Sequence, residues 1–132
     1  MGSASSFICR ACGTHFMAMD GGGFMFDLLH CDTCGTTKSV SHQELGDIHL
    51  GFVKGLPGPY ALARAGMDRR IQAEYPGRML TRDEYHAEAE ATLGRCGCGG
   101  TFSYDAPARC PGCRSTEDQW DEDPNGVSMC ID

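Results

Sequence analysis

The cysteines constrain the fold of this chain more than any other feature. Eight of its nine cysteines form four close pairs, which are Cys9/Cys12, Cys31/Cys34, Cys96/Cys98 and Cys110/Cys113. Two thiolates held in one tight turn point to the same place, and two such turns supply the four ligands of a tetrahedral metal site. The sequence therefore predicts two four-sulfur metal sites in a chain of 132 residues.

The ligand type indicates Zn²⁺, two ions per chain, because thiolates in closed tetrahedral sites are its usual structural ligands. A disulfide framework and iron in a rubredoxin-like site are the alternatives. Residues 1–6 are small and polar without an apolar signal segment, and the close pairs suit chelation better than separate crosslinks. We therefore expect reduced thiols in the cytoplasm. Because no apolar run is long enough to span a bilayer, we expect no membrane partner.

The paired stretches resemble the knuckles of the zinc-ribbon class, in which Cys-x-x-Cys-Gly lies at the tip of a β-hairpin. The matching stretches are 9–13, 31–35 and 110–113. A glycine after the second cysteine lets the turn adopt a positive φ, and Gly13, Gly35 and Gly99 are placed to do so. Arg114 departs from this pattern, and Cys96-Gly97-Cys98 is one residue tighter than the other pairs. The resemblance implies metal binding and names no activity.

The spacing between pairs favours two sites made from consecutive pairs. Eighteen residues separate Cys12 from Cys31 and eleven separate Cys98 from Cys110, and both gaps suit a single hairpin. Loop-closure entropy favours this local pairing modestly. The predicted sites are Cys9, Cys12, Cys31 and Cys34 in the first, and Cys96, Cys98, Cys110 and Cys113 in the second. Pairing of the first knuckle with the last is the alternative.

The predicted fold class is a small, metal-stabilised α+β protein, in which two β-hairpin zinc ribbons flank a short helical insert. The expected segments are an N-terminal ribbon at 1–40, an insert of about three helices at 41–95, a second ribbon at 96–116 and an acidic tail at 117–132. Strands are expected at 14–19, 24–29, 36–40 and 101–104, from alternating apolar residues and flanking turn residues.

Helix starts are predicted at two serine or threonine caps. Ser41 with Glu44 and Thr81 with Glu84 each match the capping-box spacing. The first helix should run to Gly55, with His49 and Phe52 on its inward face. A further helix should open near Pro59 and turn Tyr60, Ala63, Met67 and Ile71 inward.

Charge argues against nucleic-acid binding, which is the commonest role of zinc ribbons. The formal net charge is −7, and it becomes about −11 with eight thiolates and two Zn²⁺ ions. Such a field repels a phosphate backbone. The preferred function is a non-enzymatic adaptor or accessory subunit for another protein, with Trp120, Arg64, Arg69 and Arg70 as candidate partner-binding residues. The alternative is nucleic-acid binding through the arginine cluster of the insert, to which Arg78 and Arg82 also belong.

Catalytic candidates are few. Each predicted site is filled by four thiolates, whereas a catalytic zinc keeps one position open. His15 and His30 lie beside knuckles and could open a position by replacing a cysteine. The ninth cysteine, Cys130, is expected to be a surface thiol, with redox sensing or a role as an extra metal ligand as the alternatives. An enzyme that uses an incomplete site or Cys130 is therefore the third hypothesis.

Overall fold

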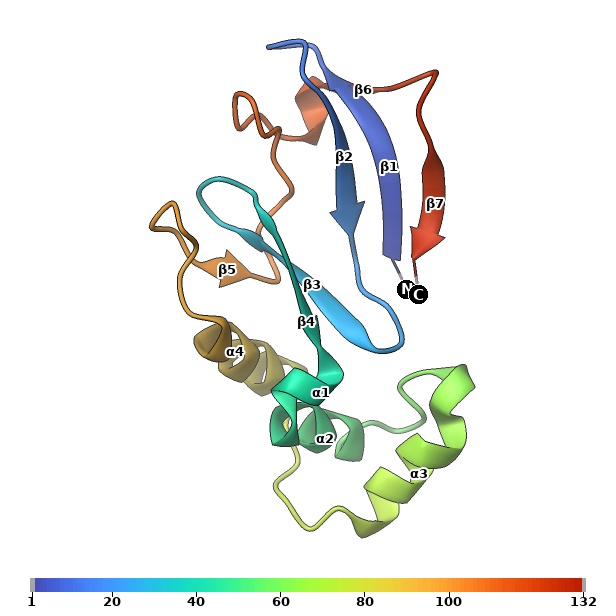
Figure 1. Cartoon of the computed structure of the whole chain (residues 1–132). Helices are drawn as coiled ribbons and strands as arrows, with labels where there is room; N and C mark the ends of the chain where they lie inside the picture. The colour runs from blue at the N-terminus through green and yellow to red at the C-terminus, as the bar shows by residue number, and fades with distance from the viewer. Residues whose placement is uncertain (1, 132) are drawn as a thin grey trace.

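The structure is a computed structural model that describes residues 2–131. It contains two sheets, and one of them includes strands from both the N-terminal and the C-terminal end of the chain. The antiparallel sheet A consists of β1 (Gly2–Cys9), β2 (His15–Asp20), β6 (Trp120–Glu122) and β7 (Ser128–Ile131). β1 is central, because β2 pairs with one edge while β6 and β7 pair with the other. Figure 1 shows β7 and β1 side by side, although they come from opposite ends of the sequence.

Sheet B is smaller and is built around a buried strand. β3 (Phe26–Cys31) pairs with β4 (Thr37–Ser41) along one edge and with β5 (Phe102–Ser103) along the other. Five of the six β3 residues are buried, as expected for a central strand covered by helices.

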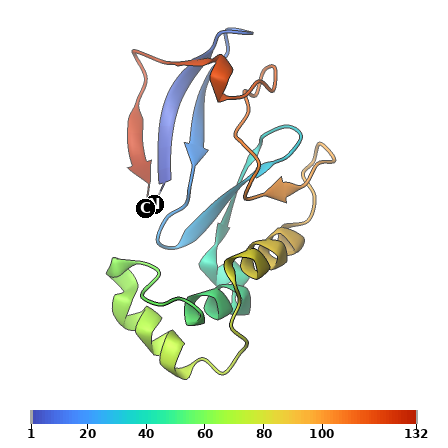
Figure 2. The same ribbon diagram turned by 180° about the vertical axis from the view of Figure 1, so that it is seen from behind.

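The helices cover sheet B at the end of the molecule away from the β1–β2 turn (Figures 1 and 2). They are α1 (His42–Leu45), α2 (Asp47–Lys54), the 3₁₀ turn η1 (Leu62–Arg64), α3 (Ala65–Glu74) and α4 (Arg82–Leu93). The main core lies between them and sheet B. Its largest buried apolar side chains are Leu29, Val40, Leu45, Phe52, Leu80, Tyr85 and Phe102. The chain is thus a small α+β protein with antiparallel sheets, as the sequence predicted.

The four predicted strands are present at β2, β3, β4 and β5, but the expected hairpin between β2 and β3 is wrong. β4 pairs with β3 along one edge and β5 pairs with His30 and Cys31 on the other, while no residue of β3 pairs with β2. β2 pairs instead with β1, whose residues 2–6 carry no strand signal strong enough to predict. Each N-terminal knuckle therefore closes a hairpin of its own, β1–β2 or β3–β4.

The first helix of the insert is also shorter than predicted. Ser41 caps it as expected, accepting a hydrogen bond from the Glu44 backbone amide at 3.0 Å. The helix ends at Gly46, where φ is 55° and ψ is −121°, and α2 begins immediately afterwards. α4 begins at Thr81 with a complete capping box, which confirms the second predicted start.

The segment predicted as an acidic tail contributes two strands to sheet A. η2 (Glu117–Gln119) leads into β6, and Cys9 is the register partner of Trp120. The Trp120 ring packs edge-on against Phe16, with centroids 4.8 Å apart, and only 9% of the residue is exposed. Trp120 therefore completes a small second core in sheet A and is not an exposed anchor for a partner.

Candidate metal centres

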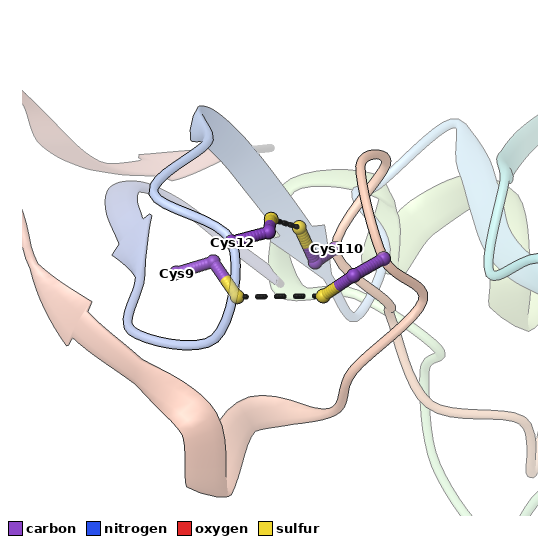
Figure 3. Close-up of side chains that lie close together, drawn as sticks. Cys9, Cys12 and Cys110 are labelled. Atoms are coloured by element: carbon purple, nitrogen blue, oxygen red, sulfur yellow. Dashed lines mark hydrogen bonds between the residues drawn. The ribbon is translucent and has the colours of Figure 1, made fainter.

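The first four-sulfur cluster connects the β1–β2 turn with the loop that lies between β5 and η2. Cys9 and Cys12 come from the β1–β2 turn, while Cys110 and Cys113 come from a loop that follows β5. The Cys9 and Cys113 Sγ atoms lie 3.6 Å apart, and the Cys12 and Cys110 Sγ atoms lie 3.5 Å apart. Figure 3 shows the two loops facing each other with their sulfurs turned inward. We call this cluster the Cys9 site.

The second cluster lies beside sheet B. Cys31 and Cys34 come from the β3–β4 turn, and Cys96 and Cys98 come from the turn between α4 and β5. The Cys31 and Cys98 Sγ atoms are 3.4 Å apart, and the Cys34 and Cys96 Sγ atoms are 3.6 Å apart. We call this cluster the Cys31 site.

The eight cysteines thus form two quartets, but the predicted division between them is wrong. Each N-terminal pair meets a C-terminal pair, so that the Cys31 site is nested in sequence inside the Cys9 site. The physical reason is the strand pairing. β1–β2 and β3–β4 are separate hairpins, and β6 and β5, near the C-terminal pairs, add to β1 and β3 respectively.

The sulfur geometry fits a tetrahedral thiolate site. Four sulfurs about 2.3 Å from a central zinc ion lie about 3.8 Å from one another. The ligand atoms of each quartet all lie within 4.8 Å of one another, and the close cross-pairs span 3.4 to 3.6 Å. A disulfide needs about 2.05 Å, and all nine cysteines are free thiols. The donor set suits Zn²⁺ and also fits iron, so sulfur geometry alone does not identify the metal.

The backbone of the knuckles follows the resemblance closely. φ is 76° at Gly13, 75° at Gly35 and 94° at Gly99, as expected for the residue after the second cysteine. Arg114 occupies the corresponding place and takes φ 65°, so it adopts the knuckle conformation without being a glycine. Its backbone amide still donates to the Cys110 carbonyl at 2.8 Å. The sequence departure at Arg114 therefore changes the energy of the turn and not its shape.

Three knuckles carry a hydroxyl two residues after their second cysteine, a signal that the sequence analysis missed. The Sγ–Oγ distances are 3.1 Å for Cys12 and Thr14, 2.9 Å for Cys34 and Thr36, and 3.2 Å for Cys113 and Ser115. The Ser115 hydroxyl also lies 3.2 Å from Cys9 Sγ and lowers the pKa of that thiol to about 6. The Thr36 hydroxyl likewise lowers the pKa of Cys34 to about 6. These hydroxyls favour the thiolate form that a metal requires.

The fourth knuckle lacks such a hydroxyl and is held differently. Gly100 stands at the equivalent place after Cys98, and the turn closes one residue earlier, with the Cys96 amide donating to the Gly100 carbonyl at 2.8 Å. Asp32, from the facing knuckle, accepts from the Thr101 amide and hydroxyl at 3.0 Å each. The Asp32 carboxylate therefore clamps the two turns of the Cys31 site together.

The histidines beside the knuckles are not members of either quartet. His30 is buried, and its Nε2 lies 2.8 Å from the Met19 carbonyl oxygen, so this ring links β3 to β2. His15 Nδ1, on β2, lies 3.5 Å from a carboxylate oxygen of Asp123, which follows β6 on the other side of β1. Cys130 is exposed on β7, opposite Ser3 and outside both quartets.

The predicted partner-binding arginines lie at the far end of the molecule from the Cys9 site. Arg64 ends η1, while Arg69 and Arg70 belong to α3 and are exposed. Arg70 Nε is already paired with a Glu74 carboxylate at 3.0 Å, within the same helix. The structure therefore separates the arginines from Trp120, and the four residues do not form one surface.

A buried polar network in the helical end was missed by sequence reasoning. The Asp27 carboxylate accepts from His42 Nε2 at 3.0 Å, from the Tyr104 hydroxyl at 2.7 Å and from the Tyr85 hydroxyl. Burial alone would raise the pKa of Asp27, but these three hydrogen bonds outweigh it and lower the pKa to about 2. The signal in the sequence was an aspartate at an inward position of an otherwise apolar strand. Such a residue needs buried donors.

The His42 and His49 rings stack beside this network, with centroids 3.7 Å apart. The two residues lie on successive helices on either side of Gly46, and the break at Gly46 allows the contact. Burial lowers the pKa of His49 to about 4, with the nearby His42 adding to the effect. His49 is therefore neutral at pH 7.

A family model matches residues 5–119, described as "Domain of unknown function (DUF8255)". The chain belongs to this family. The DUF8255 match contains all eight cysteines of the two quartets, and Cys130 with β7 lies beyond it. No curated protein and no solved structure shows significant similarity to the chain. Within residues 2–131, none of the helices combines the length and apolar character needed to cross a membrane.

Proposed function

We propose that this chain is a non-enzymatic, zinc-stabilised protein that binds another protein. The observation that carries the proposal is that each candidate metal site brings together four thiols. Four thiolates fill a tetrahedral zinc site and leave no position for water or substrate. The metal then acts as a structural element, and the surface of the domain performs the function.

Zinc at both sites would be held by the eight cysteines and would contribute free energy of folding. Structural zinc sites supply an apparent ~10–16 kcal/mol in small peptides at neutral pH. The sheets here are short and the core is small, so a contribution of that size decides whether the domain folds. Because thiolates hold zinc only while reduced, the proposal also implies a reducing compartment, as expected for the cytoplasm.

The surface proposed for the partner is the α3 face, which we define as Leu62, Met67, Arg69 and Arg70. Leu62 is 89% exposed and Met67 is 56% exposed, and the arginines are exposed on the same helix as Met67. Methionine and arginine are enriched at protein interfaces. Leu62 has the largest exposed fraction among the exposed large apolar side chains of residues 2–131. A hollow of about 300 Å³ adjoins the face and is lined by Leu50, Met67, Arg70, Ile71, Glu74 and Tyr75.

Nucleic-acid binding remains the second candidate, because three arginines cluster on η1 and α3. Two features weigh against it. Arg70 is paired with Glu74, and Arg78 is paired with Glu84 and Glu88, so much of the positive charge is compensated locally. The formal net charge of −7 also opposes approach of a polyanion.

The test compares capture by the zinc-loaded protein and by surface variants of it. The double variant Leu62→Asp/Met67→Asp alters the α3 face, and Met79→Asp is the matched control, since Met79 is 61% exposed and lies outside that face. We expect quantitative mass spectrometry to find a protein retained by the wild type and the control, and lost from the double variant. Identical recovery on all three baits, or no specific recovery, contradicts the proposal.

The alternative is tested with the same proteins. Fluorescence anisotropy with single- and double-stranded oligonucleotides at low salt measures nucleic-acid binding directly. Binding that weakens with added salt and is lost in Arg69→Gln/Arg70→Gln would favour the nucleic-acid role over the adaptor role.

A further inference from the structure

Sheet A has two apolar faces, and the cores of the protein account for only one of them. Phe7, Phe16 and Trp120 share the inner face, where they form the second core. Side chains alternate between the two faces along a strand, so Ile8 of β1 points to the opposite side. Residues paired in register share a face. The outer face of sheet A, as we call this opposite side, therefore carries Ala4, Ile8, Met17, Met19, Met129 and Ile131, together with Val127 just before β7.

The outer face of sheet A is exposed to solvent. Met17 and Met129 are each 48% exposed and Val127 is 52% exposed, and these are three of the seven exposed large apolar side chains of residues 2–131. None of the outer-face side chains belongs to either core. An antiparallel sheet that faces water on one side normally carries polar residues there. A methionine-rich outer face therefore indicates a surface that another molecule covers.

The dimensions of the outer face match those of a single helix. The sheet is three strands wide, because β6 and β7 pair with the same edge of β1 and β2 pairs with the other. Neighbouring strands are about 4.8 Å apart, so the flanking strands lie about 10 Å from each other, close to the diameter of one α-helix. β1 has eight residues and spans roughly 27 Å, which is the length of a helix of about 18 residues.

The charge around sheet A is strongly negative. The two stretches that form it, residues 2–20 and 117–131, contain six carboxylates and one arginine. That arginine, Arg10, is already paired with Asp121 at 3.4 Å. Among the strand residues of the outer face only His15 and Asp121 can carry charge, and both are register partners of Ile8 at one end of the sheet. A complementary partner is therefore apolar along its centre and cationic at its margins.

A second copy of the chain is a poor match for the outer face. Two copies stacked through it would bring together two acidic regions, and each chain has a formal net charge of −7. Like charges at this density oppose association, whereas lysine and arginine side chains are attracted. The flexible thioethers of Met17, Met19 and Met129 can adapt to the apolar side of a helix.

We propose that the outer face of sheet A docks a basic amphipathic helix of a partner protein. The apolar stripe of that helix would lie along β1, between the methionines of β2 and the apolar residues of β7. Its lysines and arginines would meet the carboxylates of the surrounding strands and turns. This surface is separate from the α3 face, so the proposal does not rest on the function proposed above.

The test uses synthetic peptides and the zinc-loaded full chain. The first probe is a fluorescent helical peptide of about 18 residues, with leucines on one side and lysines on the other. One control peptide has the same composition with the leucines scattered around the helix, and another has glutamate in place of lysine. We expect fluorescence anisotropy to show saturable binding of the first peptide that weakens as salt is added, and at least about tenfold weaker binding of both controls. No saturable binding, or equal binding of the scattered peptide, overturns the proposal.

Variants locate the binding to one surface. Met17→Thr/Met129→Thr removes apolar contacts from exposed strand positions and keeps residues that favour strands, so it should bind the peptide about tenfold more weakly. Two zinc ions per chain and unchanged amide dispersion check that this variant is folded. Leu62→Asp/Met67→Asp alters the α3 face and should bind like the wild type, which separates this proposal from the previous one. Unchanged binding by Met17→Thr/Met129→Thr overturns the proposal.

Sedimentation of the wild type without peptide tests the other occupant. We expect a monomer. A wild-type dimer that becomes a monomer in Met17→Thr/Met129→Thr would assign the outer face to a second copy and overturn the proposal.

Discussion

Arg114 shows what a single residue contributes to a metal knuckle. It takes φ 65° where the other three knuckles have glycine, and left-handed backbone costs an L-residue roughly 1–2 kcal/mol. We therefore predict that Arg114→Gly stabilises the zinc-loaded protein by about 1 kcal/mol, measured by denaturant unfolding. The Arg109 side chain donates a hydrogen bond to the backbone carbonyl of residue 114 at 3.1 Å, and this bond does not need the Arg114 side chain. A loss of stability in this variant would mean that the side chain makes a contribution larger than the backbone strain.

His49 gives the domain a pH dependence whose sign can be worked out. Its pKa is about 4 in the folded protein and about 6.5 in the unfolded chain, so the unfolded chain binds the proton more readily. The stability linked to His49 is complete above pH 6.5 and falls as the pH drops towards 4. We predict that the wild type loses about 1 kcal/mol more than His49→Gln between pH 7 and pH 5.5.

This difference is measured by urea unfolding at each pH, and the comparison with a variant cancels the shared effect of thiolate protonation. His15→Gln, at a site where 68% of the side chain is exposed, is the control and should follow the wild type. Parallel pH curves for the wild type and His49→Gln would contradict the assignment.

Individual residues were predictable from the sequence to the extent that their chemistry is local. The eight cysteines could be selected by spacing alone. The hydroxyls at Thr14, Thr36 and Ser115 were equally visible as a repeat but have meaning only beside a sulfur. Asp27 and His42 could not be paired in advance, because the contact depends on how α1 follows β4.

At the scale of elements, Gly46 divides one predicted helix into α1 and α2. Its φ of 55° with ψ −121° is open to glycine and strained for any other residue. We predict that Gly46→Ala destabilises the protein by about 1–2 kcal/mol and disturbs the His42–His49 stack. Gly66→Ala is the matched control. A Cβ at Gly66 meets nothing within 4 Å inside α3, so this change should stabilise by about 0.5–1 kcal/mol. Thermal unfolding of both variants checks the pair, and equal effects would refute the argument.

The elements that could be predicted are those whose signals lie within a few residues. Thr81 and Glu84 complete a capping box three residues apart, and α4 begins there. β1 was missed because Ser3, Ser5 and Ser6 carry no alternating apolar pattern. Its strand structure is imposed by β2, β6 and β7, which flank it on both edges.

At the scale of the whole molecule, the sequence could not predict which knuckles share a metal site. Closing the longer loops of the observed sites costs only about 1.5 kcal/mol more per site than closing the short ones. The free energy of one structural zinc site is several times larger. Strand pairing, which brings β5 and β6 beside β3 and β1, therefore decides which sulfurs meet.

The nested arrangement allows us to predict how the protein responds to the loss of one metal site. Cys113→Ser leaves three sulfurs in the Cys9 site, so native mass spectrometry should find one zinc ion per chain in place of two. Hydrogen exchange should show lost protection in β1 and β6, with protection retained in β3 and β4. Cys130→Ser is the control, because Cys130 lies outside both quartets, and it should keep two zinc ions. Two ions retained in Cys113→Ser would contradict the assignment of this quartet.

The separation of the two halves of each quartet also sets an order on events during translation. At about 5–20 residues per second, the ribosome needs roughly 3–12 s to proceed from Cys34 to Cys96. During that interval the nascent chain presents two N-terminal knuckles. Each of them is half of a metal site and can hold a metal ion with only two sulfurs. The ion can be locked in only after nearly the entire polypeptide has emerged, so a prematurely terminated product would bind it loosely and release it.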